Sequence, residues 1–152
     1  MNPIHPVLAP LARAAKERKG LEDALRRALA VPAWLRAEHR VGDPNAYMRH
    51  VLYVDPDGDF VITAITWLPG QVSPVHGHHV WCAFGVAEGE LTEEQFDLRL
   101  VVLKTARYHA GEVAEPSQIH RVANRGRAPL VSLHLYGVSA ERLTTGINRI
   151  YA

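Results

Sequence analysis

The sequence lacks several features that would direct a protein to a membrane, a nucleic acid or an oxidising compartment. Its single cysteine cannot form an internal disulfide, so a reducing cytoplasm is expected. The 17 Lys and Arg residues nearly balance the 16 Asp and Glu residues, which argues against a basic nucleic-acid surface. No apolar run approaches the ~20 residues that cross a bilayer. Pro6, Pro10 and Arg13 interrupt the only stretch that could resemble a signal peptide. We therefore expect a soluble protein that binds neither nucleic acid nor membrane.

The hydrophobic pattern changes its period along the chain of 152 residues, which is most simply one domain. From about Pro6 to Val31, apolar residues recur every three or four positions, which predicts helices. Gly20 separates two such segments, and Pro32 ends the second. These patterns predict an N-terminal helical cap over residues 1–40.

From Tyr47 onward the pattern is that of short strands separated by turn residues. The predicted strand segments are 47–54, 60–68, 80–89, 90–109, 119–124 and 130–137. The turn "DPDGD" joins the first two as a hairpin. Strands at this spacing, with no helices between them, predict a sandwich or a closed barrel over residues 41–152. The fold class is therefore all-β.

Histidines are concentrated in the segment "VHGHHVWC". His76 and His78 are two positions apart, so in an extended chain they point to the same face, whereas His79 points to the other. Two neutral imidazoles on one face form half of a site for iron, zinc, copper or nickel. A single histidine would more simply be a solvated or hydrogen-bonded side chain.

The residues around this pair keep a characteristic spacing. They are Gly70, His76, His78, Cys82 and Gly89, followed later by Gly111, Pro116, His120 and Asn124. This spacing resembles the two motifs of the cupin superfamily, with Cys82 in the place of the usual glutamate and one glycine of the second motif missing. The resemblance implies a double-stranded β-helix, or jelly-roll barrel, that binds a metal through His76, His78 and His120.

The missing glutamate changes the expected charge of the metal site. Three neutral imidazoles leave the full 2+ charge of the metal uncompensated, which favours an anionic ligand such as a thiolate. With three positions held by protein, three remain for substrate and dioxygen.

The segment "LVSLHLYG" alternates strictly between apolar and polar residues. Its polar row is Ser132, His134 and Tyr136. This row either faces water on a half-exposed strand or points into the barrel. In the second case each residue needs a hydrogen-bond partner, and each can donate to the next.

These segments together resemble the thiol dioxygenases of the cysteine dioxygenase type. The family has a three-histidine iron site, a Ser-x-His-x-Tyr strand and an early Tyr-x-Arg pair, which Tyr47 and Arg49 match. The resemblance runs from Trp34 to about Tyr151. It implies Fe(II) at the three histidines and a catalytic row of Ser132, His134 and Tyr136. It also implies that Tyr47 and Arg49 bind the substrate, with the Arg49 guanidinium pairing with the substrate carboxylate.

Cys82 and Trp81 bear on which member of that family the chain resembles. Cys82 is compatible with the thioether to Tyr136 that the animal enzymes carry, although a buried thiol can also simply pack in the core. Gly77 stands where the family commonly has Asp, so an acidic group that could orient an imidazole is expected to be missing. Trp81 resembles the bacterial 3-mercaptopropionate dioxygenases, but those usually carry Gln at the position of Arg49.

The predicted function is oxidation of a small thiol acid by dioxygen to its sulfinic acid. L-cysteine is the first expected substrate, 3-mercaptopropionate the second and mercaptosuccinate the third. A non-oxidative cupin that binds Zn, Ni or Mn, either an isomerase or a small-molecule binding module, stays open as another class, because a fold does not determine a function. The sequence leaves monomer and homo-oligomer equally open.

Overall fold

The computed structural model describes residues 3–115 and 117–152, so Pro116 of the second predicted motif lies outside the described residues. Within that part of the chain the helices are α1 (Ala9–Glu17) and α2 (Leu21–Ala30), with 3₁₀ turns at Pro6–Leu8, Ala37–Arg40 and Ala140–Arg142. The strands are β1 (Met48–Val54), β2 (Val61–Trp67), β3 (His76–His78), β4 (Cys82–Glu88), β5 (Glu90–Phe96), β6 (Val102–His109), β7 (His120–Ala123), β8 (Leu130–Tyr136) and β9 (Asn148–Ile150). None of these helices is long and apolar enough to span a membrane.

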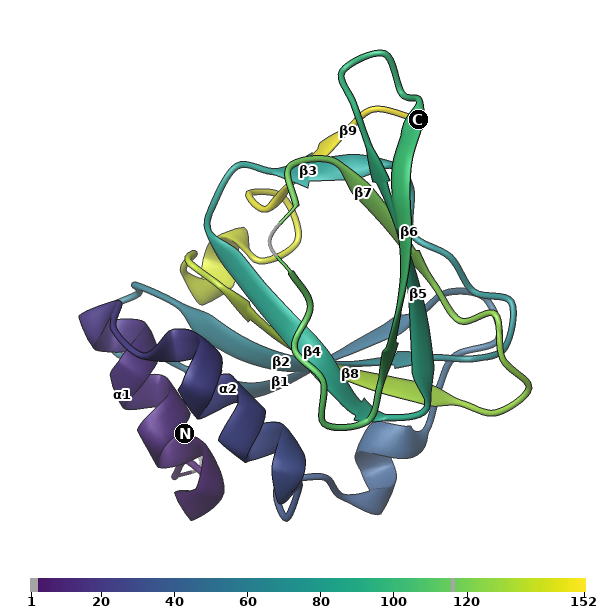
Figure 1. Cartoon of the computed structure of the whole chain (residues 1–152). Coiled ribbons are helices and arrows are strands. Elements are labelled where there is room, and N and C mark those ends of the chain that lie inside the picture. The colour runs from purple at the N-terminus through teal and green to yellow at the C-terminus, as the bar shows by residue number, and fades with distance from the viewer. Residues whose placement is uncertain (1–2, 116) are drawn as a thin grey trace.

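The strands form two antiparallel sheets that enclose a common interior. One sheet has the order β1-β2-β8-β4, and the other has the order β6-β5-β7-β3-β9. Figure 1 shows the two sheets curving around the interior, with α1 and α2 lying against the outside of the β1-β2-β8-β4 sheet. The predicted all-β barrel is therefore present. The division into a cap over 1–40 and a barrel over 41–152 stays a prediction.

The two N-terminal helices form where the sequence predicts them, because each presents one apolar face. Gly20 separates them in a left-handed conformation, with φ at 67°. Leu11 of α1 and Leu25 and Leu29 of α2 are fully buried. They pack in one cluster with Ile62 of β2 and with the outer face of β8. The helices thus cover a sheet face that would otherwise be exposed to water.

Strand β8 is buried on both of its faces. Its apolar row packs in the cluster beneath the N-terminal helices and consists of Val131, Leu133 and Leu135. Its polar row is also buried, since Ser132, His134 and Tyr136 are each no more than 5% exposed. Of the two alternatives left open by the sequence, the structure shows the one in which the polar row points into the barrel.

The short strands β3 and β9 were not separately predicted. β3 lies between β7 and β9, and its first residue His76 is paired with His120 of β7. His78 at the other end of β3 is paired with Asn148 of β9. The C-terminal strand therefore completes the sheet that carries the predicted metal ligands.

Candidate metal centre

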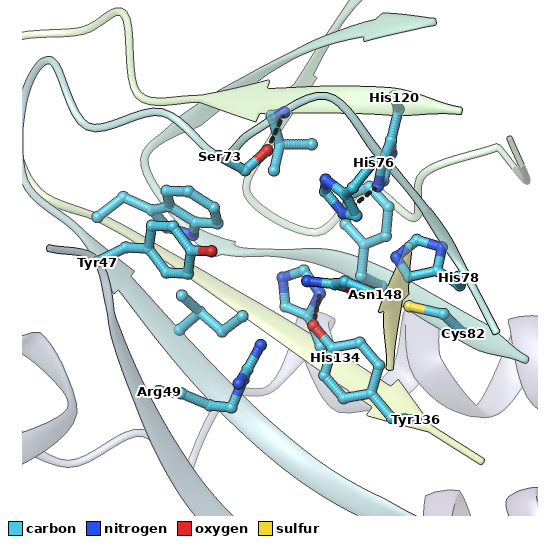
Figure 2. Close-up of a pocket in the computed structure, with 14 residues that line it drawn as sticks. Tyr47, Arg49, Ser73, His76, His78, Cys82, His120, His134, Tyr136 and Asn148 are labelled. Atoms are coloured by element: carbon cyan, nitrogen blue, oxygen red, sulfur yellow. Dashed lines mark hydrogen bonds between the residues drawn. The ribbon is translucent and has the colours of Figure 1, made fainter. Parts of the chain in front are cut away.

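Three histidines meet inside the barrel. His76 and His78 come from β3 and His120 from β7, and one ring nitrogen of each lies within 4.8 Å of those of the other two. Figure 2 shows the three rings turned toward one another at one side of the cavity. His79 is exposed instead, as the alternation along the strand predicted, and its backbone N–H donates to the Ile147 carbonyl. The structure thus brings together the three histidines that the motifs indicated.

The hydrogen bonds of two of these rings determine where their protons lie. His76 Nδ1 is 2.8 Å from the Pro74 carbonyl oxygen, and His120 Nδ1 is 2.7 Å from a Glu93 carboxylate oxygen. Both partners accept at these contacts, so both Nδ1 atoms carry the proton in the neutral rings. The Nε2 atoms are then unprotonated, yet they lie only 3.1 Å apart.

That arrangement fits a metal ion. Two lone pairs that converge at this distance repel each other unless a cation lies between them. Two imidazoles that share one metal at about 2.0–2.1 Å place their nitrogens about 3 Å apart, close to the observed separation. Burial lowers the pKa of His76 to about 4 and that of His78 to about 3, with a further lowering by the neighbouring His120. Near neutral pH these two rings are therefore ready to bind a metal without first losing a proton.

Glu93 of β5 is a residue of this site that sequence reasoning missed. It is fully buried, and besides His120 it is hydrogen-bonded by Gln95 and Ser117 at 2.9 and 3.3 Å. Burial alone would raise the pKa of Glu93, but these hydrogen bonds, that of His120 foremost, hold it below its ordinary value. The expectation that no acidic group orients an imidazole is therefore wrong for His120.

The position of Glu93 also corrects the expected charge of the site. Its carboxylate is one hydrogen bond away from the metal ligands, so part of a 2+ charge would be compensated within the protein. The sequence carries no clear signal for this role, because residues 91–96 place one glutamate on each face of the strand and only the structure shows that Glu93 is the buried one.

The structure gives a physical reason for Gly77 between the two histidines. A Cβ atom at this position would lie 2.9 Å from the Gln118 backbone carbonyl oxygen and 3.4 Å from the Tyr151 ring. A side chain at position 77 would require the backbone at Gln118 to move. The acidic group that orients an imidazole is therefore supplied from another strand.

Cys82 lies beside Tyr136. The two residues are direct partners in the antiparallel pairing of β4 with β8, so their side chains share the inward face. Figure 2 shows the sulfur of Cys82 and the Tyr136 ring beside the three histidines. Burial raises the pKa of the Cys82 thiol to about 12, so it is a protonated thiol at neutral pH.

The polar row of β8 forms a continuous hydrogen-bonded chain that begins at Trp67 of β2. Trp67 Nε1 donates to Ser132 Oγ at 2.9 Å, Ser132 Oγ lies 2.7 Å from His134 Nε2, and His134 Nδ1 lies 3.3 Å from the Tyr136 hydroxyl. Sequence reasoning identified the row but missed Trp67.

The chain begins with a fixed donor: an indole N–H can only donate, so Ser132 accepts from Trp67. Burial, with the nearby Arg49 charge, holds the pKa of His134 well below its usual value, so the ring is neutral. A neutral imidazole donates through one nitrogen and accepts through the other, so His134 links Ser132 to Tyr136 in either tautomer.

Arg49 and Tyr47 extend from β1 and the segment before it toward the same cavity. The Arg49 Cζ atom lies 5.4 Å from the centre of the Tyr136 ring, and the Tyr47 ring stacks on Trp67 at 4.4 Å. The Nε atom of Arg49 is buried and has no hydrogen-bond partner. Among the described residues no carboxylate forms an ion pair with Arg49, so its charge is available to a ligand (Figure 2).

These groups line one small cavity inside the barrel. Further lining residues that sequence reasoning did not single out are Ile65, Ser73, Phe84, Val122 and Asn148. Ile65, Trp67, Phe84 and Val122 give the cavity apolar walls, between which lie a cation, a phenol and the three histidines. Such a cavity suits a small anionic ligand.

Comparison with known proteins agrees with this arrangement. The sequence model of the family described as cysteine dioxygenase type I matches residues 30–143. The chain belongs to the cysteine dioxygenase type I family. As a member of that family it is a dioxygenase-type oxidoreductase whose three histidines form a metal site, and its reactants are a small substrate and dioxygen.

Solved structures confirm the fold of this cysteine dioxygenase family member. A Klebsiella pneumoniae protein described as having a double-stranded β-helix domain is 24% identical with a TM-score of 0.54, over 68% of this chain and 86% of that chain. A Thermus thermophilus protein is 18% identical with a TM-score of 0.54, over 68% of this chain and 95% of that chain. A cupin superfamily protein from Desulfitobacterium hafniense is 13% identical with a TM-score of 0.51, over 65% of this chain and 84% of that chain. The predicted cupin fold is therefore confirmed.

Proposed function

We propose that this protein is a non-haem Fe(II) thiol dioxygenase that converts L-cysteine and O₂ to cysteine sulfinic acid. The observation that carries the proposal is the presence of three converging imidazoles, an unpaired Arg49 and the Tyr136 hydroxyl in one small cavity. The reaction adds both oxygen atoms to the thiol sulfur, so RSH and O₂ give RSO₂H.

The iron would be held by His76, His78 and His120, whose nitrogens and buried carboxylate partner suit a divalent transition metal. When bound, iron supplies the redox chemistry that activates dioxygen toward a thiol. Glu93 fixes the ring orientation of His120 and balances part of the charge.

Arg49 is proposed to bind the substrate carboxylate. Its guanidinium is always charged and can donate two parallel hydrogen bonds to a carboxylate, which fixes the direction in which the thiol extends. The Tyr47 hydroxyl lies on the same side of the cavity and can donate a further bond (Figure 2). This contact positions the sulfur near the three histidines.

Tyr136 is proposed to donate a hydrogen bond to the reacting groups. Burial raises the pKa of its phenol, so it keeps its proton, and the contact with His134 fixes the position of the hydroxyl. Ser132 and His134 act as positioning residues in this scheme. The apolar walls exclude water, which strengthens each of these contacts.

Cys82 and Tyr136 are proposed to form a thioether during turnover. Their direct pairing across β4 and β8 supports this bond, since the two side chains need no rearrangement of the strands to meet. Formation of the C–S bond breaks the S–H bond of Cys82 and one C–H bond of the Tyr136 ring, and dioxygen accepts both hydrogen atoms to give hydrogen peroxide.

The test is oxygen uptake by the Fe(II)-loaded protein with L-cysteine, 3-mercaptopropionate and mercaptosuccinate, with products identified by mass. We expect a gain of two oxygen atoms, most rapidly on L-cysteine. Arg49→Gln should lower kcat/KM for L-cysteine by at least ~30-fold, because the buried carboxylate loses its charged partner. Cysteamine, which has no carboxylate, serves as the matched control and should be affected much less by the same variant.

A non-oxidative metal-binding cupin is the alternative, because three histidines also bind Zn, Ni and Mn. That class has no need of the chain from Trp67 to Tyr136. If iron-loaded protein consumes no oxygen with these thiols, and His134→Ala leaves thiol binding unchanged, the alternative is favoured and the role given to the polar row is wrong.

A further inference from the structure

Asn148 brings an amide group into the cavity from the C-terminal strand. It is the direct partner of His78 in the antiparallel pairing of β9 with β3. Directly opposed residues of such a pair extend to the same face, with their Cβ atoms about 4.5–5.5 Å apart. Because His78 faces the metal centre, Asn148 does so too. Figure 2 shows its amide pointing into the space between His78 and Tyr136.

Several other polar groups of the cavity are already engaged or can only donate. Ser73 Oγ accepts from the Val122 N–H and donates to the Pro74 carbonyl. Arg49 has no acceptor atom, and the Tyr136 hydroxyl is hydrogen-bonded to His134. The Tyr47 hydroxyl can accept, but it lies on the Arg49 side of the cavity (Figure 2). The Asn148 amide lines the cavity beside His78, so its oxygen is an acceptor that a bound ligand either pairs or leaves without a partner.

We propose that Asn148 is a specificity-determining residue that accepts a hydrogen bond from the amino group of a 2-amino thiol acid. This inference rests on the proposed function. With the carboxylate held by Arg49 and the sulfur at the three histidines, the substituent on the carbon next to the carboxylate faces the remaining wall, to which Asn148 contributes. The site therefore favours L-cysteine over thiol acids that lack an amino group, since those leave the amide without a partner.

The experiment compares L-cysteine with 3-mercaptopropionate, which differ only in the amino group. Asn148→Leu keeps the approximate shape of the side chain and removes both hydrogen-bonding groups. Asn148→Ala is a second variant that removes the same groups by shortening the side chain. For both we expect kcat/KM to fall about 10-fold or more for L-cysteine and less than about 3-fold for 3-mercaptopropionate. Arg149→Leu is the matched control, because Arg149 is the next residue of β9 and is exposed. It should leave the ratio of the two kcat/KM values unchanged.

The outcomes separate this inference from the proposed function. If the variants leave the ratio of the two kcat/KM values as in the wild type, Asn148 does not recognise the amino group. A wild-type protein that oxidises only 3-mercaptopropionate would also overturn the assignment of Asn148, while the dioxygenase activity would stand. No oxygen uptake with either thiol would refute the proposed function itself, and the assignment of Asn148 with it.

Discussion

Replacing Glu93 by Gln tests whether the buried carboxylate contributes to metal binding. The substitution keeps the size of the side chain and an oxygen that can accept from His120 Nδ1, but it removes the negative charge. Loss of an acidic partner of a ligating histidine typically lowers metal affinity by about 10–100-fold, which corresponds to about 1.4–2.7 kcal/mol. The bond at issue is short, at 2.7 Å, and lies between fully buried groups, so we expect an effect within that range.

The assay is a competition titration of metal-free protein with Co²⁺ and a chelator of known affinity. Glu94→Gln is the matched control, because Glu94 is the next residue on β5 and pairs with Arg121 at 2.7 Å rather than with a histidine. It should change the dissociation constant less than about 3-fold. If Glu93→Gln binds Co²⁺ as tightly as the wild type, the carboxylate does not act on the metal through His120, and the reasoning fails.

The same substitution should also affect the metal-free protein. Glu93 accepts hydrogen bonds from Gln95, Ser117 and His120, and the new NH₂ group would face at least one of these donors. We expect the free energy of unfolding to fall by about 1–3 kcal/mol, measured by urea denaturation. An increase in stability would show that burying the charge destabilises the folded protein more than the hydrogen bonds to it stabilise the protein.

Two further predictions concern the interior of the barrel. After turnover, the intact mass should be lower by two hydrogen atoms because of the Cys82–Tyr136 thioether, whereas Cys82→Ser should retain its full mass. The metal-free protein should lose stability as pH falls from 6.5 toward 4. Because the pKa values of His76 and His78 are lowered in the folded state, the unfolded chain binds more protons over this range. For two protons, the free energy of unfolding should fall by up to about 2.7 kcal/mol per pH unit. A urea denaturation series that shows no loss of stability over this range would refute that sign.

The elements that could be predicted from the sequence are those whose apolar residues recur with a regular period. The helices around Gly20 and the alternating strand with Ser132, His134 and Tyr136 were predictable, because one-sided or two-sided burial leaves a pattern in the chain. The metal ligands His76, His78 and His120 were predictable for a different reason, since the spacing of the residues around them resembles the two motifs of a known superfamily.

Contacts between distant strands could not be predicted in the same way. β9 is three residues long and carries no periodic signal, so its pairing with β3 and the placement of Asn148 followed only from the structure. The contact of Glu93 with His120 depends on the pairing of β5 with β7, which local patterns do not specify. The bond from Trp67 to Ser132 likewise depends on the register of β2 with β8.

The double burial of β8 has a consequence for how slowly its backbone exchanges with solvent. β8 is hydrogen-bonded to β2 on one edge and to β4 on the other, while the N-terminal helices cover one face and the barrel interior covers the other. No local opening frees its amides without separating both sheet partners. In deuterated water the amide protons of β8 should therefore exchange only when the whole molecule unfolds, and their rate reports the global free energy of unfolding. Because β8 opens only when the protein unfolds, the hydrogen-bonded chain from Trp67 to Tyr136 keeps one strand register for as long as the protein is folded.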